Sequence, residues 1–287
     1  MPPPQPIGGP GVGVVIPAFN EESVLSRCLQ AVLDQTVPAE QIIVVDNAST
    51  DGTRAVVSRA QAEHPHAPLL LVEQNAEQGL VPTRNAGLDA AEAEVLGRID
   101  ADSVLAPDWI EQVQRAFTDP NLAAVTGPVI YYDLPLPRLG LALDNAGRHL
   151  MMKRVADRHP FLYGSNMAIR RTAWEQIRPT ICRDEGDRMH EDIDLSLHLR
   201  EHGLTIAYRP TMITGVSARR MDDSPTQFRS YVGRYQRTYS AHQIASPVPA
   251  TAATVLHCLY WFLKLLRPLR WPSLVHRRDC GERTSRN

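Results

Sequence analysis

Residues 12–33 read VGVVIPAFNEESVLSRCLQAVL, and this stretch decides the fold. It opens with a β-branched run at 12–16 that Pro17 closes, which is typical of a buried strand. Residues 21–33 then carry apolar side chains at helical spacing, namely Val24, Leu25, Cys28 and Leu29. The pattern predicts a strand, a loop and a helix, in that order.

The same unit recurs along the chain. Strands are predicted at 42–45, 69–72 and 95–99, and helices at 50–63 and 82–93. Later patterns indicate strands at 123–129 and 163–169 and a helix at 193–202. Strands that alternate with helices at this spacing predict an α/β fold, in which helices flank a mostly parallel, Rossmann-like mixed sheet.

Charge is unevenly distributed over the 287 residues, although the formal net charge is only −2. Residues 1–216 hold 18 Lys and Arg against 28 Asp and Glu, whereas residues 217–287 hold 12 against 4. Affinity for nucleic-acid backbones comes from accumulated Lys and Arg, so the acidic front part argues against a nucleic-acid partner. The basic tail could still meet anionic lipid.

The four cysteines, at 28, 182, 258 and 280, are widely spaced and form no C-x-x-C pair. Neither a disulfide framework nor a zinc site is expected, and a reducing cytosol fits best. His190 and His198 could suggest zinc, but no second His/Cys cluster in the sequence completes a site. Residues 1–10 are rich in Pro and Gly and are predicted to form a flexible tail rather than a signal peptide.

Polar clusters follow three of the predicted strands. Asn20 and Glu21 come after the first, Asp46 after the second, and Asp100-Ala101-Asp102 after the fourth. Ligands in open α/β sheets bind beyond the carboxyl ends of the strands, so these clusters should meet in one crevice. Asp100 and Asp102 could chelate Mg²⁺ or Mn²⁺ and thereby clamp a diphosphate. The alternative is that Asp102 caps the next turn.

Two other acidic positions have both a functional and a structural interpretation. Asp46 is well placed to accept hydrogen bonds from a base or ribose, but Asp is also common in turns. Glu191 and Asp192 open a predicted helix, where acidic residues suit the positive end of the helix dipole. One of them could also be a general base that takes a proton from an acceptor hydroxyl.

Arg84 and the segment Gly164-Ser165-Asn166 are weaker candidates. Arg84 could contact a phosphate or could be a surface arginine near a helix start. Gly164, Ser165 and Asn166 could shape an acceptor pocket or could form an ordinary turn. The glycines at 8, 9, 11 and 13 precede the first strand, so they cannot form a dinucleotide phosphate loop, and a Rossmann dehydrogenase is disfavoured.

Four motifs together resemble the family 2 glycosyltransferases with the GT-A fold. They are VVIPAFNEE at 14–22, VVDNASTDGT at 44–53, RNAG at 84–87 and IDAD at 99–102. The resemblance covers about residues 12–216 and implies a GT-A catalytic domain at 11–216. It also implies an inverting, metal-dependent enzyme that uses a nucleoside diphosphate sugar, with UDP as the default. We expect a role in cell-envelope glycan or glycolipid synthesis.

The resemblance also implies roles for single residues. The nucleotide-sugar pocket would hold Pro17, Phe19, Glu21, Asp46, Arg84 and Asp100. Asp102 would ligate the metal, and Glu191-Asp192 would match the family's E-D motif, with Asp192 as the base. The Q-x-x-R-W signature of processive members is absent from the sequence, which favours single addition. A nucleotidyltransferase and a noncatalytic nucleotide-sugar-binding protein are the alternatives.

The C-terminal part, residues 217–287, is predicted to be a basic helical extension. Its apolar stretch at 252–266 is shorter than the roughly 20 residues that a membrane-spanning helix needs. Leucines and aromatic residues followed by arginines fit an interfacial helix that would bring the enzyme to a lipid-linked acceptor. The alternative is a core or dimer helix. The protein would then be cytoplasmic, or peripheral on the inner face of the membrane.

Overall fold

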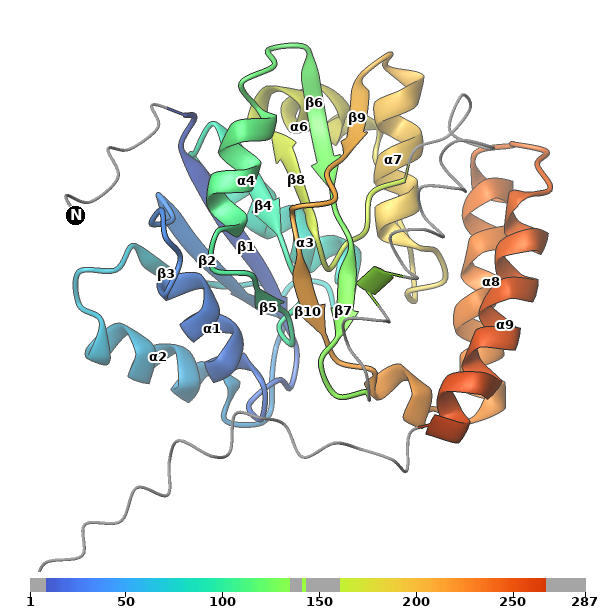
Figure 1. Ribbon diagram of the computed structural model, residues 1–287, viewed down its shortest axis with the longest axis horizontal. Coiled ribbons are helices and arrows are strands. Elements are labelled where there is room, and N and C mark those ends of the chain that lie inside the picture. The colour runs from blue at the N-terminus through green and yellow to red at the C-terminus, as the bar shows by residue number, and fades with distance from the viewer. Residues whose placement is uncertain (1–8, 135–140, 143–160, 267–287) are drawn as a thin grey trace, which may run out of the picture.

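The computed structural model describes residues 9–134, 141–142 and 161–266, and its centre is a seven-stranded sheet (Figure 1). The strand order is β3-β2-β1-β4-β8-β6-β9. The strands are β1 Val12–Ala18, β2 Gln41–Asp46, β3 Leu69–Glu73, β4 Val95–Arg98, β6 Leu122–Thr126, β8 Met167–Arg170 and β9 Thr205–Tyr208. All run parallel except β8, which is antiparallel to β4 and β6. The predicted mostly parallel mixed sheet is therefore confirmed.

Helices cover both faces of this sheet, and each face has its own apolar core. On one face Val14 and Ile16 of β1 pack with helices α1, α2 and α4, and on the other Val15 packs with α3, α6 and α7. The helices are α1 Leu25–Leu33, α2 Thr53–Glu63, α3 Leu80–Ala90, α4 Trp109–Ala116, α6 Arg171–Ile177 and α7 Glu191–Glu201. Successive side chains of a strand point to opposite faces, so the unbroken apolar run of β1 serves both cores.

Several predicted boundaries differ from the structure, and three of them have a clear local reason. The first helix begins at Leu25 because residues 21–24 form a turn in which Val24 N donates to Glu21 O. The predicted strand at 123–129 is divided at Gly127-Pro128 into β6 and β7, Val129–Tyr131. The predicted strand at 163–169 begins only at Met167, because Asn166 N donates to Tyr163 O in a turn.

A small second sheet lies beyond the main one. It has the order β5-β10-β7, with β5 Val104–Leu105 antiparallel to β10 Thr214–Val216 and β7 parallel to β10. The short helices η1 Arg178–Thr180 and η2 Arg219–Asp222 complete the connections. Because η2 follows β10 directly, the second sheet brings Arg219 to the edge of the main sheet.

Two long helices, α8 Pro225–Ala241 and α9 Val248–Leu266, stand side by side at one end of the molecule (Figure 1). A capping box of Ser224 and Gln227 starts α8. Phe228 of α8 stacks on Tyr260 of α9, with 4.2 Å between ring centroids. Tyr260 and Lys264 both donate hydrogen bonds to the carbonyl of Asp223, at 2.8 and 2.7 Å. The predicted C-terminal helical extension is thus present.

Helix α9 leaves an apolar face uncovered. The side chains of Val255, Trp261, Phe262 and Leu265 are between 55% and 77% exposed. Within the described residues, no helix has the length and apolar character needed to cross a bilayer. Residues 1–8 of the N-terminal tail predicted at 1–10, and the arginines that follow residue 266, lie outside the described residues.

Candidate active site

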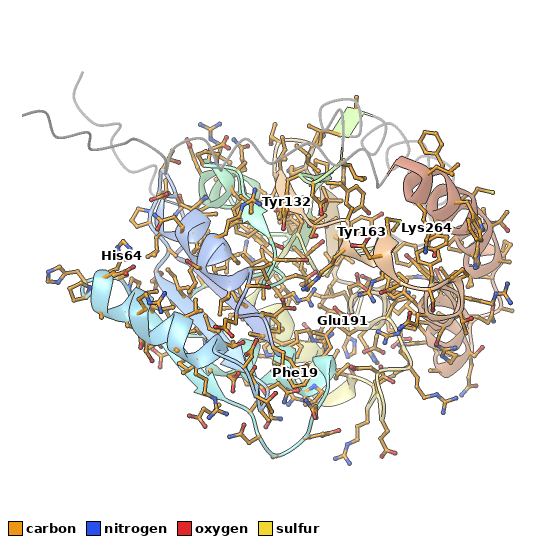
Figure 2. All side chains as sticks on the ribbon, turned by 90° about the horizontal axis from the view of Figure 1, so that it is seen from below. Phe19, His64, Tyr132, Tyr163, Glu191 and Lys264 are labelled. Atoms are coloured by element: carbon orange, nitrogen blue, oxygen red, sulfur yellow. The ribbon has the colours of Figure 1, made fainter. Side chains whose placement is uncertain are left out.

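The carboxyl ends of the parallel strands place the predicted motifs at one edge of the sheet. Asp46 ends β2, and Asp100 and Asp102 follow β4. Since β8 is antiparallel and Arg98 is paired with Met167, the segment that precedes β8 lies at the same edge. Glu191 begins α7 close by and lies near the middle of the molecule in Figure 2. The expected convergence of the motifs therefore occurs.

The loops after β1 and β2 are joined by hydrogen bonds. Asn20 has a positive φ of 55°, and its side-chain oxygen accepts from Thr50 N at 2.8 Å. Gly52 N donates to the Glu22 carboxylate at 2.9 Å. Pro17 is buried in β1, whereas Phe19 is 47% exposed at the rim. The two loops thus form a fixed wall beside Asp46.

Asp46 is fully buried at the base of this wall. Its Oδ2 pairs with Arg54 Nε at 2.7 Å and accepts from Ser49 N at 3.3 Å. Its Oδ1 has no hydrogen-bond partner among the described residues. A buried polar atom without a partner costs free energy, so this oxygen is suited to accept a hydrogen bond from a ligand.

Asp102 and Glu21 form a cation site. Asp102 is only 7% exposed, and burial, together with the nearby charge of Asp100, raises its pKa to about 6 despite Arg219. Arg219 Nε lies 3.0 Å from Asp102 Oδ2, and the same guanidinium donates two hydrogen bonds of 2.7 Å to Glu21. A cation therefore already occupies the space between these carboxylates. Carboxylate oxygens also suit Mg²⁺ or Mn²⁺, so the residues fit a hard divalent metal.

The buried Arg98 connects the two acidic motifs. Its Nη2 lies 2.9 Å from Asp100 Oδ1 and 3.1 Å from Glu191 Oε1. Burial would raise the pKa of Glu191, but the charges of Arg98 and Arg84 outweigh burial and lower it. Arg84 is also buried, and its Nη1 donates to the backbone carbonyl of Glu191 at 2.7 Å. Both arginines therefore hold Glu191 in place as a carboxylate.

Asp192 is held by backbone donors. Its Oδ2 accepts from Gly164 N at 3.1 Å, and its Oδ1 accepts from Ile193 N at 2.9 Å. Burial and the adjacent charge of Glu191 raise the pKa of Asp192. A side chain at position 164 would overlap Arg98 and come within 2.7 Å of Glu191 Oε1, so only glycine fits there. The predicted Gly164 segment thus positions the E-D motif.

Some predicted site residues form hydrogen bonds inside the protein instead of facing the crevice. Asn166 is fully buried, and its side chain joins Trp109 Nε1 at 2.7 Å to the carbonyls of Pro128 and Met212, each at 2.8 Å. The Ser165 carbonyl accepts from Ser103 Oγ at 3.4 Å. Arg84 contacts Asn85 and Glu191 rather than solvent. The structure thus shows Asn166 and Arg84 supporting the site from inside the fold.

Sequence reasoning missed Arg98 and Arg219. Arg98 did leave a signal, because an arginine within the otherwise apolar strand before Asp100 must find a carboxylate partner if it is buried. No sequence pattern pointed to Arg219, because it lies 198 residues from its partner Glu21.

Comparison with known proteins fits this arrangement. The model of "Glycosyl transferase family 2" matches residues 13–178, which is more than half of the chain. The chain belongs to this family. A second model, "Glycosyl transferase family group 2", matches residues 98–276 of this glycosyltransferase. The nucleotidyltransferase alternative finds no support in these matches.

Curated relatives of this glycosyltransferase match over part of their length. Glycosyltransferase AglE of Haloferax volcanii is 26% identical over 174 residues, which cover 59% of this chain and 56% of AglE. An N-acetylglucosaminyltransferase of Rhizobium meliloti is 31% identical over 121 residues, 41% of this chain and 28% of the relative. The chain thus spans less than two thirds of these relatives.

Solved structures confirm the predicted GT-A fold of this glycosyltransferase. Mannosyltransferase PcManGT from Pyrobaculum calidifontis, in complex with GDP-Man and Mn²⁺, superposes with a TM-score of 0.60 at 22% identity, covering 97% of this chain and 78% of that one. S. aureus TarS 1–349 in complex with UDP-GlcNAc superposes with a TM-score of 0.54 at 15% identity, covering 77% and 64%.

Proposed function

We propose that this family 2 glycosyltransferase is an inverting enzyme that moves a sugar from a nucleoside diphosphate sugar to an acceptor hydroxyl. The observation that carries the proposal is the position of Arg98, which pairs with Asp100 on one side and Glu191 on the other. This contact holds the donor-side and base-side motifs together at one sheet edge. Solved structures of similar fold are described with GDP-Man or UDP-GlcNAc, which supports a nucleotide-sugar donor.

The donor would bind along the ends of β1, β2 and β4. Asp46 Oδ1 lacks a partner among the described residues and would accept a hydrogen bond from the base or ribose. Pro17, Phe19 and Glu21 would line the same pocket, and Asp100 would lie beside the ribose. Arg84 would act by holding Glu191. UDP is the default base, and GDP is the second candidate because PcManGT is described with GDP-Man.

Asp102, assisted by Asp100, would hold Mg²⁺ or Mn²⁺. When bound, the metal would stabilise the negative charge that develops on the departing diphosphate. Arg219 Nε lies 3.0 Å from Asp102 Oδ2, so the guanidinium would have to move away from this oxygen for the metal to bind. Arg219 would keep its two hydrogen bonds to Glu21.

Asp192 would be the general base. Gly164 N and Ile193 N fix the orientation of its carboxylate, and its raised pKa suits a group that takes a proton near neutral pH. Asp192 would remove the proton of the acceptor hydroxyl as its oxygen attacks the anomeric carbon opposite the diphosphate. This single displacement would convert an α-linked donor into a β-linked product.

The acceptor would be a saccharide or a lipid-linked molecule of a cell-envelope glycan or glycolipid. The uncovered apolar face of α9 supports contact with a membrane surface, because exposed aromatic and aliphatic side chains favour the lipid interface. The protein would then be cytoplasmic and peripheral on the inner face of the membrane.

Release of nucleoside diphosphate tests the proposal. Wild-type protein is incubated with Mn²⁺, UDP- and GDP-sugars, and saccharide or membrane-lipid acceptors. Asp192→Asn should lower turnover by about 10²–10⁴-fold while donor affinity stays unchanged. The exposed Asp34→Asn serves as the matched control. Full turnover by Asp192→Asn would refute its role as base, and donor binding without any turnover would favour the noncatalytic alternative.

A further inference from the structure

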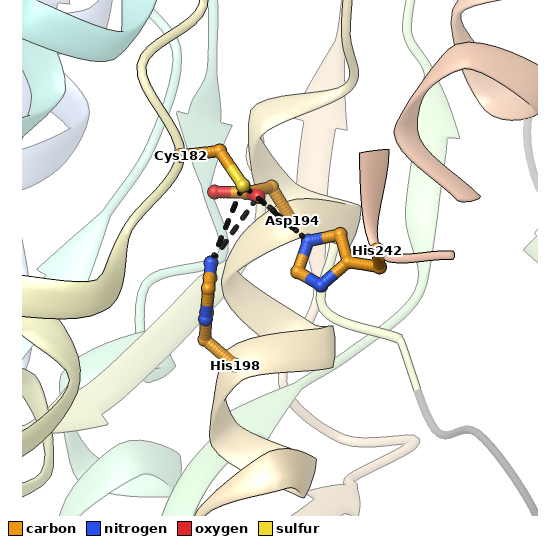
Figure 3. A group of neighbouring side chains, drawn as sticks. All are labelled: Cys182, Asp194, His198 and His242. Carbon is orange, nitrogen blue, oxygen red and sulfur yellow. Dashed lines mark hydrogen bonds and ion pairs between the residues drawn. The ribbon is translucent and has the colours of Figure 1, made fainter. Parts of the chain in front are cut away.

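Four potential metal ligands converge beside α7, outside the candidate active site. They are Cys182 in the loop after η1, Asp194 and His198 on α7, and His242 at the end of α8 (Figure 3). One ligand atom from each lies within 4.8 Å of the others. Asp194 follows Asp192 by two residues, which turns it to nearly the opposite side of the helix. The cluster is therefore separate from the E-D motif.

The distances between the ligand atoms match a tetrahedral zinc site. With Zn–S of about 2.3 Å and Zn–N of about 2.0 Å, a tetrahedron places S and N about 3.6 Å apart. Cys182 Sγ lies 3.6 Å from His198 Nε2 and 3.8 Å from His242 Nε2. Asp194 Oδ1 lies 3.5 Å from His198 Nε2 and 2.9 Å from His242 Nε2, around the roughly 3.3 Å expected for O and N. These four distances fit tetrahedral coordination, and the two remaining pairs of ligand atoms lie within 4.8 Å.

The groups around the four side chains provide a second, independent observation in favour of a bound metal. Histidines that ligate zinc usually direct the other ring nitrogen to a carboxylate. His242 does so, because its Nδ1 lies 2.9 Å from Glu201 Oε1 in a hydrogen bond. Glu201 Oε2 also lies 3.2 Å from His198 Nδ1, which is within ion-pair distance but without hydrogen-bond geometry. Asp194 Oδ2 is buried and has no hydrogen-bond partner among the described residues. The Nε2 atoms of both histidines are thereby aimed at the centre of the cluster.

We propose that Cys182, Asp194, His198 and His242 bind one structural Zn²⁺. A thiolate, two neutral imidazoles and a carboxylate form a closed four-ligand set, and the two anionic ligands balance the charge of the ion. This proposal departs from the sequence-based expectation of no zinc site, because the completing ligands are distant in sequence and adjacent only in the fold. His190 is not part of the site and instead packs on Tyr231 and Tyr235.

The proposed zinc would join three segments that meet behind the active site. Cys182 belongs to the loop between η1 and α7, His242 caps the C-terminus of α8, and the other two ligands lie on the helix that begins with Glu191-Asp192. Binding to a folded site stabilises the fold and fixes these segments relative to one another. The proposal does not depend on the glycosyltransferase chemistry.

Metal content of the purified full chain tests the site. After dialysis against a weak chelator, the wild type should retain about one zinc per chain. Cys182→Ser and His242→Gln should each lose most of it, whereas the matched controls Cys258→Ser and His66→Gln should keep it. Asp102→Asn should also keep it, which separates this zinc from any metal at the sheet edge. Equal zinc in the wild type and both cluster variants would overturn the proposal.

A second readout does not require the variants to fold. Wild-type protein stripped of metal is titrated with Co²⁺, and a thiolate ligand should produce an intense sulfur-to-cobalt charge-transfer band that one equivalent of Zn²⁺ removes. The carboxylates around Asp102 cannot produce this band. Its absence would show that the four side chains form only a hydrogen-bonded cluster.

Discussion

Arg219 binds Glu21 through two hydrogen bonds of 2.7 Å, and so connects η2 with the loop after β1. The same guanidinium lies 3.0 Å from Asp102. A positive side chain thus holds the two carboxylates together at the place where the proposed enzyme would bind its metal. Arg219 and a divalent metal would compete for Asp102.

Arg219→Ala should make the protein more responsive to metal. Without the guanidinium, Glu21 and Asp102 repel each other, so the melting temperature without metal should fall. The rise in melting temperature on adding Mn²⁺ should then exceed that of the wild type, because no side chain has to be displaced. Thermal denaturation with and without Mn²⁺ measures both effects. Arg229→Ala, an exposed arginine of α8, is the control, and a Mn²⁺ response no larger than that of the wild type would contradict the competition.

Arg98→Met should destabilise the protein strongly. The substitution leaves the buried Glu191 carboxylate without Arg98, and removing one partner of a buried ion pair costs roughly 3–5 kcal/mol. Urea denaturation should show this loss. Arg115→Ala removes the exposed pair with Glu111 and should cost less than about 1 kcal/mol. Similar midpoints for the two variants would show that Arg98 does not hold the motifs together.

The apolar face of α9 should bind anionic vesicles. Phe262→Ser with Leu265→Ser removes two side chains that are 59% and 77% exposed, so the fold should be little affected. Each buried apolar side chain contributes about 1.5–3 kcal/mol, so the double variant should bind at least about tenfold more weakly in vesicle sedimentation. Leu70→Ser, on β3 and 48% exposed, should bind like the wild type. A wild type that does not bind vesicles would favour the core or dimer helix.

The sequence predicted the parts of the site that follow directly from strand ends. Asp46, Asp100 and Asp102 come immediately after apolar runs, and parallel strands bring such residues to one edge. The E-D motif was predicted from its place in the chain and from the family resemblance. Its contact with Arg98 could not be predicted, because that contact depends on β8 being antiparallel and on Gly164 lying beside β4.

The other features of the structure, the Cys182 cluster and the role of Asn166, depend on tertiary contacts that leave no local pattern in the sequence. Cys182 and His242 are 60 residues apart, and neither belongs to a recognisable metal-ligand spacing. The Gly164-Ser165-Asn166 segment predicts an acceptor pocket, yet the polar side chain of Asn166 joins three buried segments. Local periodicity could not reveal either arrangement, because each is created by elements that are distant in sequence and meet only in the folded structure.

The most direct test of the account is the binding of nucleotide sugars to the wild type and to Asp102→Asn. Melting temperatures are measured with a panel of UDP- and GDP-sugars, first with Mn²⁺ and then with chelator, and Arg229→Ala is the control. A ligand that binds the native state raises the melting temperature according to its concentration over Kd. The account predicts that at least one sugar nucleotide stabilises the wild type only with Mn²⁺, and that Asp102→Asn loses this response. Equal stabilisation of Asp102→Asn, or no response of the wild type to any nucleotide, would contradict it.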